Sequence, residues 1–307
     1  MVAAIDVGSN SAHLLVARVG HDVVPLHDES VLLGLGAAVD AHGVVPSATA
    51  DTLVAALWTY ASVARSLGAR EIVVLGTEPF RRAADAARIV LSVGEVAGVP
   101  MHVLGHDEEG LLTLLGATGG RALTADVVVA DVGGGSSEIV VAGPGRPPVT
   151  WAFLLGSARA SARHVEHDPP TAGEVAAIRE EARRVMEAAP DAKPDEIIIV
   201  GGTASNLVKV DPTGQLEGPL TRERLDRILA SLLSLPAEEV AERHAIHVPR
   251  ARILVAGAVL VEAILDRYGL DTAHATDAGI RDGAAIALAR SGRAWRDALP
   301  RIATGRS

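Results

Sequence analysis

The sequence predicts an α/β protein built from two related halves, and three observations support that prediction. A strand, a short polar loop and a second strand open the chain at residues 2–19, and the same arrangement recurs at residues 127–142. Apolar runs of strand length then alternate with stretches whose apolar residues recur at helical spacing. Such alternation is typical of parallel strands covered by helices. The two copies lie too far apart for a solenoid repeat, so we expect duplicated domains with a cleft between them.

The first half is expected to extend its opening hairpin with alternating helices and strands. Asp6 is the polar residue of the first strand, and Gly8, Ser9 and Asn10 supply the turn. Gly68 is a typical helix stop. The expected elements are strands 2–7 and 12–19, helix 47–67, strand 71–75, helix 83–97, strand 101–104 and helix 108–117.

The second half is expected to repeat the hairpin and then become mainly helical. Thr171 is predicted to cap a helix, with Glu174 closing a capping box. The expected elements are strands 127–131, 138–142 and 149–155, helix 171–188, strand 196–200, a helix opened by the turn 201–205, helices 221–233, 237–243 and 251–268, strand 273–276, and a closing helix from residue 282.

The duplication alone places the domain boundary near Gly119 and Gly120, because no linker or low-complexity tract separates the halves. We therefore expect an N-terminal domain at residues 1–119 and a C-terminal domain at residues 120–307. The last helix, residues 282–291 and onward, is a candidate to pack back on the N-terminal domain.

Composition excludes several classes of function. The 307 residues are 49% apolar but only 2% aromatic, which indicates a globular protein with an aliphatic core. The chain has no cysteine, which excludes disulfides, thiolate zinc sites and a cysteine nucleophile. A net charge of −10 argues against broad nucleic-acid binding, so an anionic substrate would need local cations, backbone amides or a metal ion.

The apolar runs also bear on location. Runs such as residues 197–200 are far shorter than the roughly 20 residues that span a bilayer, so no membrane partner is expected. The N-terminus opens directly into a strand and lacks the features of a signal peptide. We therefore predict a cytoplasmic protein.

The first loop is a candidate anion site of low specificity. Residues Gly8 to Ser11 are small, so their N–H groups can converge on an anion, and Ser9 and Ser11 add hydroxyls. Asp6, just before the loop, is a candidate ligand of a metal through water. An ordinary β-turn, in which Asp6 and Asn10 cap the backbone, is the alternative interpretation.

The second loop is more specific. Three consecutive glycines at positions 133–135 carry an entropic cost, and close approach of the backbone to phosphate explains them. Asp131 and Glu138 flank this loop, and two carboxylates beside an anion repel each other unless a cation such as Mg2+ intervenes. A flexible glycine turn with solvated acids is the alternative.

A third loop, starting at Gly201, follows an apolar strand and opens a helix, whose unpaired N–H groups make a good phosphate subsite. A tight strand-to-helix connection explains the pattern equally well. The three loops supply the phosphate-binding candidates Gly8, Ser9, Asn10, Ser11, Gly133, Gly134, Gly135, Ser136, Gly201, Gly202 and Thr203. The metal candidates are Asp6, Asp131 and Glu138, with Mg2+ or Mn2+ as the expected cofactor.

Six motifs recur in the order of a known family. They are Ala4-Ile-Asp-Val-Gly-Ser-Asn-Ser-Ala-His-Leu-Leu15, Gly76-Thr-Glu-Pro-Phe-Arg-Arg-Ala83, Asp107-Glu-Glu109, Asp131-Val-Gly-Gly-Gly-Ser-Ser-Glu138, Gly201-Gly-Thr203 and Gly279-Ile-Arg-Asp-Gly283. They resemble the motifs of the exopolyphosphatase and guanosine pentaphosphate phosphohydrolase family and cover nearly the whole chain. The resemblance implies two ribonuclease H-like domains of the actin, Hsp70 and sugar kinase superfold, with an interdomain cleft.

The resemblance also implies catalytic roles. Glu109 matches the family's glutamate that is proposed to activate water, and Arg81 matches its phosphate-binding arginine. From the residues alone, Glu109 is equally an acid favoured at a helix start, and Glu108 is easily confused with it. Arg81 and Arg82 are either a phosphate clamp or a solvated pair.

The activity implied by the resemblance is Mg2+-dependent hydrolysis of terminal phosphate from inorganic polyphosphate, with 5′-phosphate hydrolysis of guanosine pentaphosphate (pppGpp) as the alternative. The expected ligands are polyphosphate or guanosine penta- or tetraphosphate. A second copy of the chain, forming a homodimer, is a further expected partner. Ala12 and Gly110 depart from the family's usual Phe and Ala, which leaves substrate preference open. The extra helical domain of longer members is not seen, so shorter polyphosphate chains are expected.

Two readings from other classes remain. A nucleotide- or alarmone-binding regulator would keep the loops but lose turnover, and Glu109 argues against it. An ATP-dependent kinase or chaperone shares the superfold, but fold does not determine function.

Overall fold

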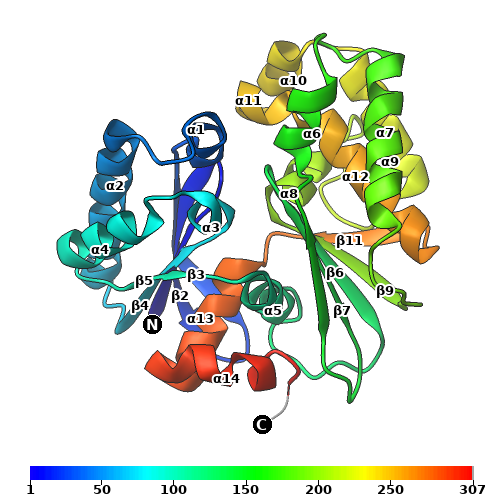
Figure 1. Ribbon diagram of the computed structural model, residues 1–307. Helices are drawn as coiled ribbons and strands as arrows, with labels where there is room; N and C mark the ends of the chain where they lie inside the picture. Colours follow the sequence, from blue (N-terminus) through cyan, green and yellow to red (C-terminus); the bar gives the residue numbers. More distant parts are fainter. Residues whose placement is uncertain (306–307) are drawn as a thin grey trace. The chain divides into compact units, whose positions relative to one another are not determined.

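The computed structural model describes residues 1–305, which divide into two compact units (Figure 1). Unit 1 consists of Met1–Ala122 together with the segment from Ala278 onward, and unit 2 is Leu123–Asp277. The division falls three residues after the boundary expected from the duplication. It also groups the C-terminal segment with the N-terminal residues.

The sheet of unit 1 has the strand order β3-β2-β1-β4-β5. Strand β1 pairs antiparallel with β2 and parallel with β4, and β4 pairs parallel with β5. The strands are β1 (Val2–Val7), β2 (Ser11–Val19), β3 (Val23–Leu32), β4 (Glu71–Gly76) and β5 (Met101–Val103). The sequence analysis did not predict β3, because this edge strand is largely exposed and has no apolar periodicity.

Helices cover both faces of this sheet. The β1 residues Ala3, Ile5 and Val7 pack in one cluster with α1, α2 and α4, whereas Val2 and Ala4 pack in another with α5, α13 and α14. The alternation follows from the two-residue period of a strand. The helices are α1 (Leu35–His42), α2 (Ser47–Ser66), α3 (Glu78–Arg82), α4 (Ala86–Ala97), α5 (His106–Ala117), α13 (Ile280–Ser291) and α14 (Trp295–Ile302), with a 3-10 turn at Gly292–Ala294.

The expected helix 83–97 is wrong in its first turn. A short helix, α3, ends at Arg82, and α4 starts only at Ala86, because Ala83 is in an extended conformation. Arg81 therefore lies on a separate short helix that follows β4.

The sheet of unit 2 has the strand order β10-β11-β9-β6-β7-β8. Strand β6 pairs antiparallel with β7 and parallel with β9, as β1 does with β2 and β4. The strands are β6 (Val127–Val132), β7 (Ser137–Ala142), β8 (Val149–Phe153), β9 (Glu196–Val200), β10 (Leu220–Thr221) and β11 (Thr272–Thr276). The order β8-β7-β6-β9 repeats β3-β2-β1-β4, which confirms the predicted α/β fold with duplicated halves.

The helices of unit 2 form its large apolar core with the sheet. Helix α12 is central, because nearly every side chain from Leu254 to Leu265 is buried. Thr171 and Glu174 form the predicted capping box of α7. The helices are α6 (Ser157–His164), α7 (Ala172–Met186), α8 (Gly201–Lys209), α9 (Arg222–Leu233), α10 (Ala237–His244), α11 (Val248–Ala251) and α12 (Leu254–Tyr268). Across residues 1–305, no helix combines the length and apolar character needed to cross a bilayer.

Candidate active site

The first hairpin loop leaves backbone donors available but uses its hydroxyls internally. The Gly8 N–H closes the hairpin on the Ser11 carbonyl at 3.0 Å. The Ser9 hydroxyl donates to Glu78 at 3.0 Å, and the Ser11 hydroxyl lies 2.6 Å from His13 Nε2. Among residues 1–305, the N–H groups of Ser9 and Asn10 donate to no protein acceptor. An anion at this loop would therefore meet backbone donors rather than free hydroxyls.

The carbonyls of the first loop are oriented by the start of α1. The Gly36 N–H donates to the Ser9 carbonyl at 2.7 Å, and the N–H groups of Leu33 and Gly34 donate to the Asn10 carbonyl at 2.8 and 3.0 Å. Because the carbonyls face this helix, the peptide N–H groups of the loop are directed away from it.

The second loop has the same construction, with Gly134 and Gly135 in place of Ser9 and Asn10. The start of α6 binds its carbonyls: Ser157 N–H donates to Gly133 O at 2.8 Å, and Arg159 N–H donates to Gly134 O at 3.0 Å. A Cβ on Gly156 would lie 2.5 Å from Gly133 O, so only glycine fits at that approach. In the part of the chain that the structure describes, the N–H groups of Gly134, Gly135 and Ser136 have no protein acceptor.

Asp131 and Glu138 lie directly opposite each other at the base of the second loop. Residues opposite each other in an antiparallel pair point to the same face, with Cβ atoms about 5 Å apart. Glu138 is buried, at 5% exposure. Two carboxylates so close, one of them buried, are the oxygen-rich donor set that fits a hard divalent cation.

The third loop packs directly against Asp131. Gly201 has a φ of 83°, and a Cβ there would lie 2.7 Å from Asp131 Oδ1. The Thr203 hydroxyl donates to the carbonyl of Val132 at 2.5 Å. Within unit 2, the structure therefore brings together the triple glycine, both acids and the start of α8.

Arg250 is a cation that the sequence analysis missed. Its guanidinium lies beside the third loop, where a Cβ on Gly202 would be 2.6 Å from Nη1. Burial lowers the pKa of Arg250, and no carboxylate among the described residues pairs with it. An unpaired, partly buried guanidinium favours binding of an anion. Arg250 lies on a four-residue helix, far in the chain from the glycine motifs, so no sequence pattern marked it as a site residue.

In unit 1, the two residues predicted to be catalytic contact each other. Arg81 Nη1 donates to Glu109 Oε2 at 2.6 Å and to the carbonyl of Leu104 at 3.0 Å. Arg81 Nη2 lies 3.2 Å from His106 Nδ1. Glu109 is only 8% exposed, so this pair is largely shielded from solvent.

The neighbouring residues of the pair have other partners. Glu108 accepts the Gly105 N–H at 2.9 Å as part of the α5 cap and is ion-paired with Arg296. Arg82 pairs with Glu78 and Asp40, both at 2.5 Å. These contacts distinguish Arg81 and Glu109 from their neighbours in a way the sequence could not.

Asp6 lies at the end of β1, opposite His13 in the hairpin. Burial raises the pKa of Asp6 to about 6, and Arg281 partly opposes that rise. The first hairpin thus places a histidine where the second has Glu138.

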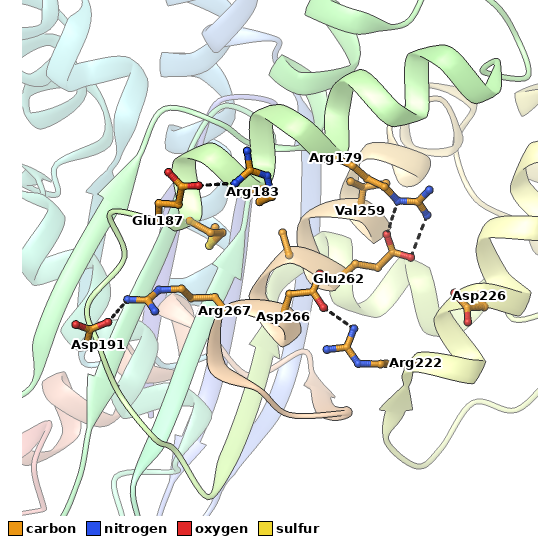
Figure 2. A pocket seen from close by; sticks show the side chains of 12 residues that line it. Arg179, Arg183, Glu187, Asp191, Arg222, Asp226, Val259, Glu262, Asp266 and Arg267 are labelled. Atoms are coloured by element: carbon orange, nitrogen blue, oxygen red, sulfur yellow. Dashed lines mark hydrogen bonds and ion pairs between the residues drawn. The ribbon is translucent and has the colours of Figure 1, made fainter.

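A pocket of 770 Å3 between α7, α9 and α12 differs from the candidate site in its charges (Figure 2). Its arginines carry carboxylate partners, so an anion entering it would have to displace them, and the predicted site residues are not among those that line it. The pairs drawn in Figure 2 are Arg179–Glu262, Arg183–Glu187, Arg222–Asp266 and Arg267–Asp191.

Comparisons with known proteins show the family of the chain. Exopolyphosphatase 2 of Mycobacterium tuberculosis is 30% identical, with 94% of this chain and 98% of that protein covered. A guanosine-5′-triphosphate,3′-diphosphate pyrophosphatase of Vibrio atlanticus is 21% identical, with 94% and 59% covered. A crystal structure of the Aquifex aeolicus member of the Ppx/GppA family has the same fold, with a TM-score of 0.83, 22% identity, and 95% and 98% of the two chains covered. The Ppx/GppA phosphatase family matches residues 15–291, and the chain belongs to that family of phosphatases.

Proposed function

We propose that the protein is an exopolyphosphatase, which hydrolyses the terminal phosphate of inorganic polyphosphate with Mg2+ or Mn2+. The observation that carries the proposal is the second loop, where unpaired N–H groups of Gly134, Gly135 and Ser136 stand beside two opposed carboxylates. Donors bind phosphate oxygens, and acids hold a cation. Both requirements of a polyphosphate end are present in one loop.

In this proposal, the binding groups of unit 2 hold the terminal phosphates. The N–H groups of the second loop and the guanidinium of Arg250 bind phosphate oxygens. Asp131 and Glu138 would hold the metal ion, with Asp6 as a further ligand through water. When bound, the metal ion supplies positive charge that offsets the charge of the phosphate oxygens in the transition state.

The acid–arginine pair of unit 1 supplies the groups that act on water. Glu109 accepts a proton from the attacking water, and Arg81 binds the phosphate under attack. Because Arg81 is bonded to Glu109 at 2.6 Å, a substrate phosphate competes with Glu109 for this guanidinium. The proposal assigns groups of both units to one reaction.

Hydrolysis of pppGpp is the second candidate, because a relative bears the name of a guanosine-5′-triphosphate,3′-diphosphate pyrophosphatase. The chain covers 98% of exopolyphosphatase 2 but only 59% of that relative, which favours polyphosphate. Cellular location and oligomeric state stay predictions.

The deciding experiment measures phosphate release from polyphosphates of defined length and from pppGpp side by side, with Mg2+ and with EDTA. We expect release from short polyphosphates to exceed release from pppGpp, and EDTA to abolish both. Faster release from pppGpp would reverse the preference, and no release from either substrate would leave a binding protein instead of an enzyme.

A further inference from the structure

The segment that joins β5 to α5 is held from one side by Arg296 of the C-terminal helix. Arg296 Nη2 donates to the carbonyl of Val103 at 3.2 Å and to Glu108 Oε2 at 2.7 Å, and Nε donates to Glu108 Oε1. The ion pair is therefore bidentate, the geometry that restricts an arginine and a carboxylate most strongly. The hydrogen bonds from Arg296 lower the pKa of Glu108, so this acid is ionised at neutral pH.

Helix α14 fixes the position of Arg296. Trp295, Leu299 and Ile302 are all at most 4% exposed in the cluster beneath the sheet. The Trp295 ring also meets His102, a β5 residue, edge to face at 5.7 Å. Because its neighbour Trp295 packs against β5, Arg296 lies beside the segment that joins β5 to α5.

The second half of helix α5 is fixed by α13. A Cβ on Gly116 would collide with the carbonyl of Gly279, and one on Gly283 would collide with that of Leu112. Such close backbone approach leaves little freedom for the two helices to slide. Figure 1 shows α13 and α14, in orange and red, beside α5. The first turn of α5, which carries Glu109, lies beyond this contact and depends on other groups.

Arg81 contacts the same segment through different residues, namely Leu104, His106 and Glu109. The two arginines differ in what they face. Arg81 binds the carboxylate of Glu109 itself, whereas Arg296 binds its neighbour Glu108. A phosphate that takes the guanidinium of Arg81 would remove a contact from Glu109 while leaving the Arg296 pair intact.

We propose that Arg296 is a positioning residue for Glu109, holding the first turn of α5 in place through Glu108 while Arg81 turns from Glu109 to the substrate. The inference rests on the proposed function, because it assigns Glu109 the task of accepting a proton from water. A base displaced by about 1 Å loses much of its rate advantage, but substrate binding by other groups is unaffected. Loss of Arg296 should therefore lower kcat and leave KM nearly unchanged.

The test compares Arg296→Gln with wild type and with Arg293→Gln, in which an arginine of the same segment, 90% exposed, is removed. On short polyphosphate with saturating Mg2+, Arg296→Gln should lower kcat about tenfold with KM within about twofold, whereas Arg293→Gln should match wild type. Hydrogen exchange of the amides at residues 105–110 should become faster in Arg296→Gln only.

A double-mutant cycle separates positioning from a general loss of stability. Glu108→Gln keeps an acceptor for the Gly105 N–H but loses the ion pair, so it should resemble Arg296→Gln. Adding Arg296→Gln to Glu108→Gln should then have little further effect on kcat. Fully multiplicative losses would show that Arg296 acts elsewhere and would overturn the inference.

The remaining outcomes are also distinct. If wild type hydrolyses polyphosphate and Arg296→Gln has the wild-type kcat, the inference fails and the proposed function stands. If Arg296→Gln raises KM as much as it lowers kcat, Arg296 contributes to binding and the inference is wrong. A wild-type chain that releases no phosphate from polyphosphate or pppGpp overturns the proposed function and this inference with it, whatever the exchange shows.

Discussion

The two hairpins have the same backbone arrangement but different side-chain chemistry. Each opens its unit, and each has an aspartate, Asp6 or Asp131, as the second-last residue of its first strand. Each also has its loop carbonyls bound by the start of a helix. A threonine after the neighbouring parallel strand, Thr77 or Thr203, donates its hydroxyl to the carbonyl that follows the aspartate, at 3.2 and 2.5 Å. The duplication therefore extends to individual hydrogen bonds.

The charges on the two hairpins are not duplicated. The residue opposite Asp6 is His13, whereas the residue opposite Asp131 is Glu138. In the first loop, the serine hydroxyls bond to Glu78 and His13, while the second loop has Gly134 in place of Ser9 and keeps a serine, Ser136, in place of Ser11. The first hairpin thus satisfies much of its own polarity, whereas under the proposed function the second would hold a cation and bind an anion.

Under the proposed function, the two units have separate tasks. Unit 2 would supply the binding loop, its acids and Arg250, while unit 1 would supply Glu109 and Arg81. The two units keep the same hairpin fold, and under the proposal a few side chains determine which copy binds phosphate.

The largest expected effect concerns the aspartates. Asp131→Asn should lower kcat about a thousandfold and raise the Mg2+ concentration needed, because it removes one of two carboxylates that would share the cation. Asp6→Asn, opposite a histidine, should cost less than about tenfold. Mg2+ titrations of phosphate release measure both, and equal losses in the two variants would erase the proposed difference between the hairpins.

The second effect distinguishes substrate binding, proposed for unit 2, from turnover, proposed for unit 1. Glu109→Gln keeps the shape and an acceptor for Arg81 but removes the base, so kcat should fall about a hundredfold while polyphosphate still binds. Titration calorimetry measures binding and phosphate release measures turnover. Parallel loss of both would make Glu109 a structural residue, and an unchanged rate would mean that another group activates the water.

A smaller effect is expected at Arg250. Arg250→Gln should raise KM for polyphosphate about tenfold with a modest change in kcat, because it removes an unpaired cation beside the third loop. Arg183→Gln is the matched control, since that arginine already has carboxylate partners at the helix surface. Equal KM values for Arg250→Gln and wild type would remove Arg250 from the site.

The smallest effect is on stability. Burial raises the pKa of Asp6 to about 6 from an unfolded value of 3.8, so folding favours its protonated form. Its contribution to stability is full below pH 3.8 and is lost as the pH rises through about 6. In EDTA, the melting temperature of wild type relative to Asp6→Asn should therefore fall by a few degrees between about pH 4 and pH 7. A constant difference across that range would show that Asp6 is solvated.

Local chemistry made much of the fold predictable. The strands β1 and β6 and the α7 capping box follow from apolar runs and from Thr171 and Glu174, which need no distant partner. Strand β3 and helix α1 were not predicted, because neither has a clear local sequence pattern. Strand β3 is an exposed edge strand, and α1 is a short helix whose start is bound to the first loop.

The site was predictable to the extent that its motifs are local. The glycines at 133–135 and their flanking acids predict a phosphate loop from the local sequence alone. Arg250 and Arg296 carried no such signal, because an isolated arginine on a helix is ordinarily a solvated surface residue. Only burial beside Gly202, in one case, and a bidentate pair with Glu108, in the other, distinguish them.

By itself, the sequence determined the α/β class, the duplicated hairpins and the loops able to contact phosphate, because these depend on residue type and spacing within a few positions. Tertiary structure alone decided that Asp131 faces Glu138 while Asp6 faces His13, that Arg81 bonds to Glu109 instead of solvent, and that α14 holds the start of α5. Strand register sets the two hairpin pairings, and the two arginine pairs join residues far apart in the chain, so helix packing sets them rather than any local preference.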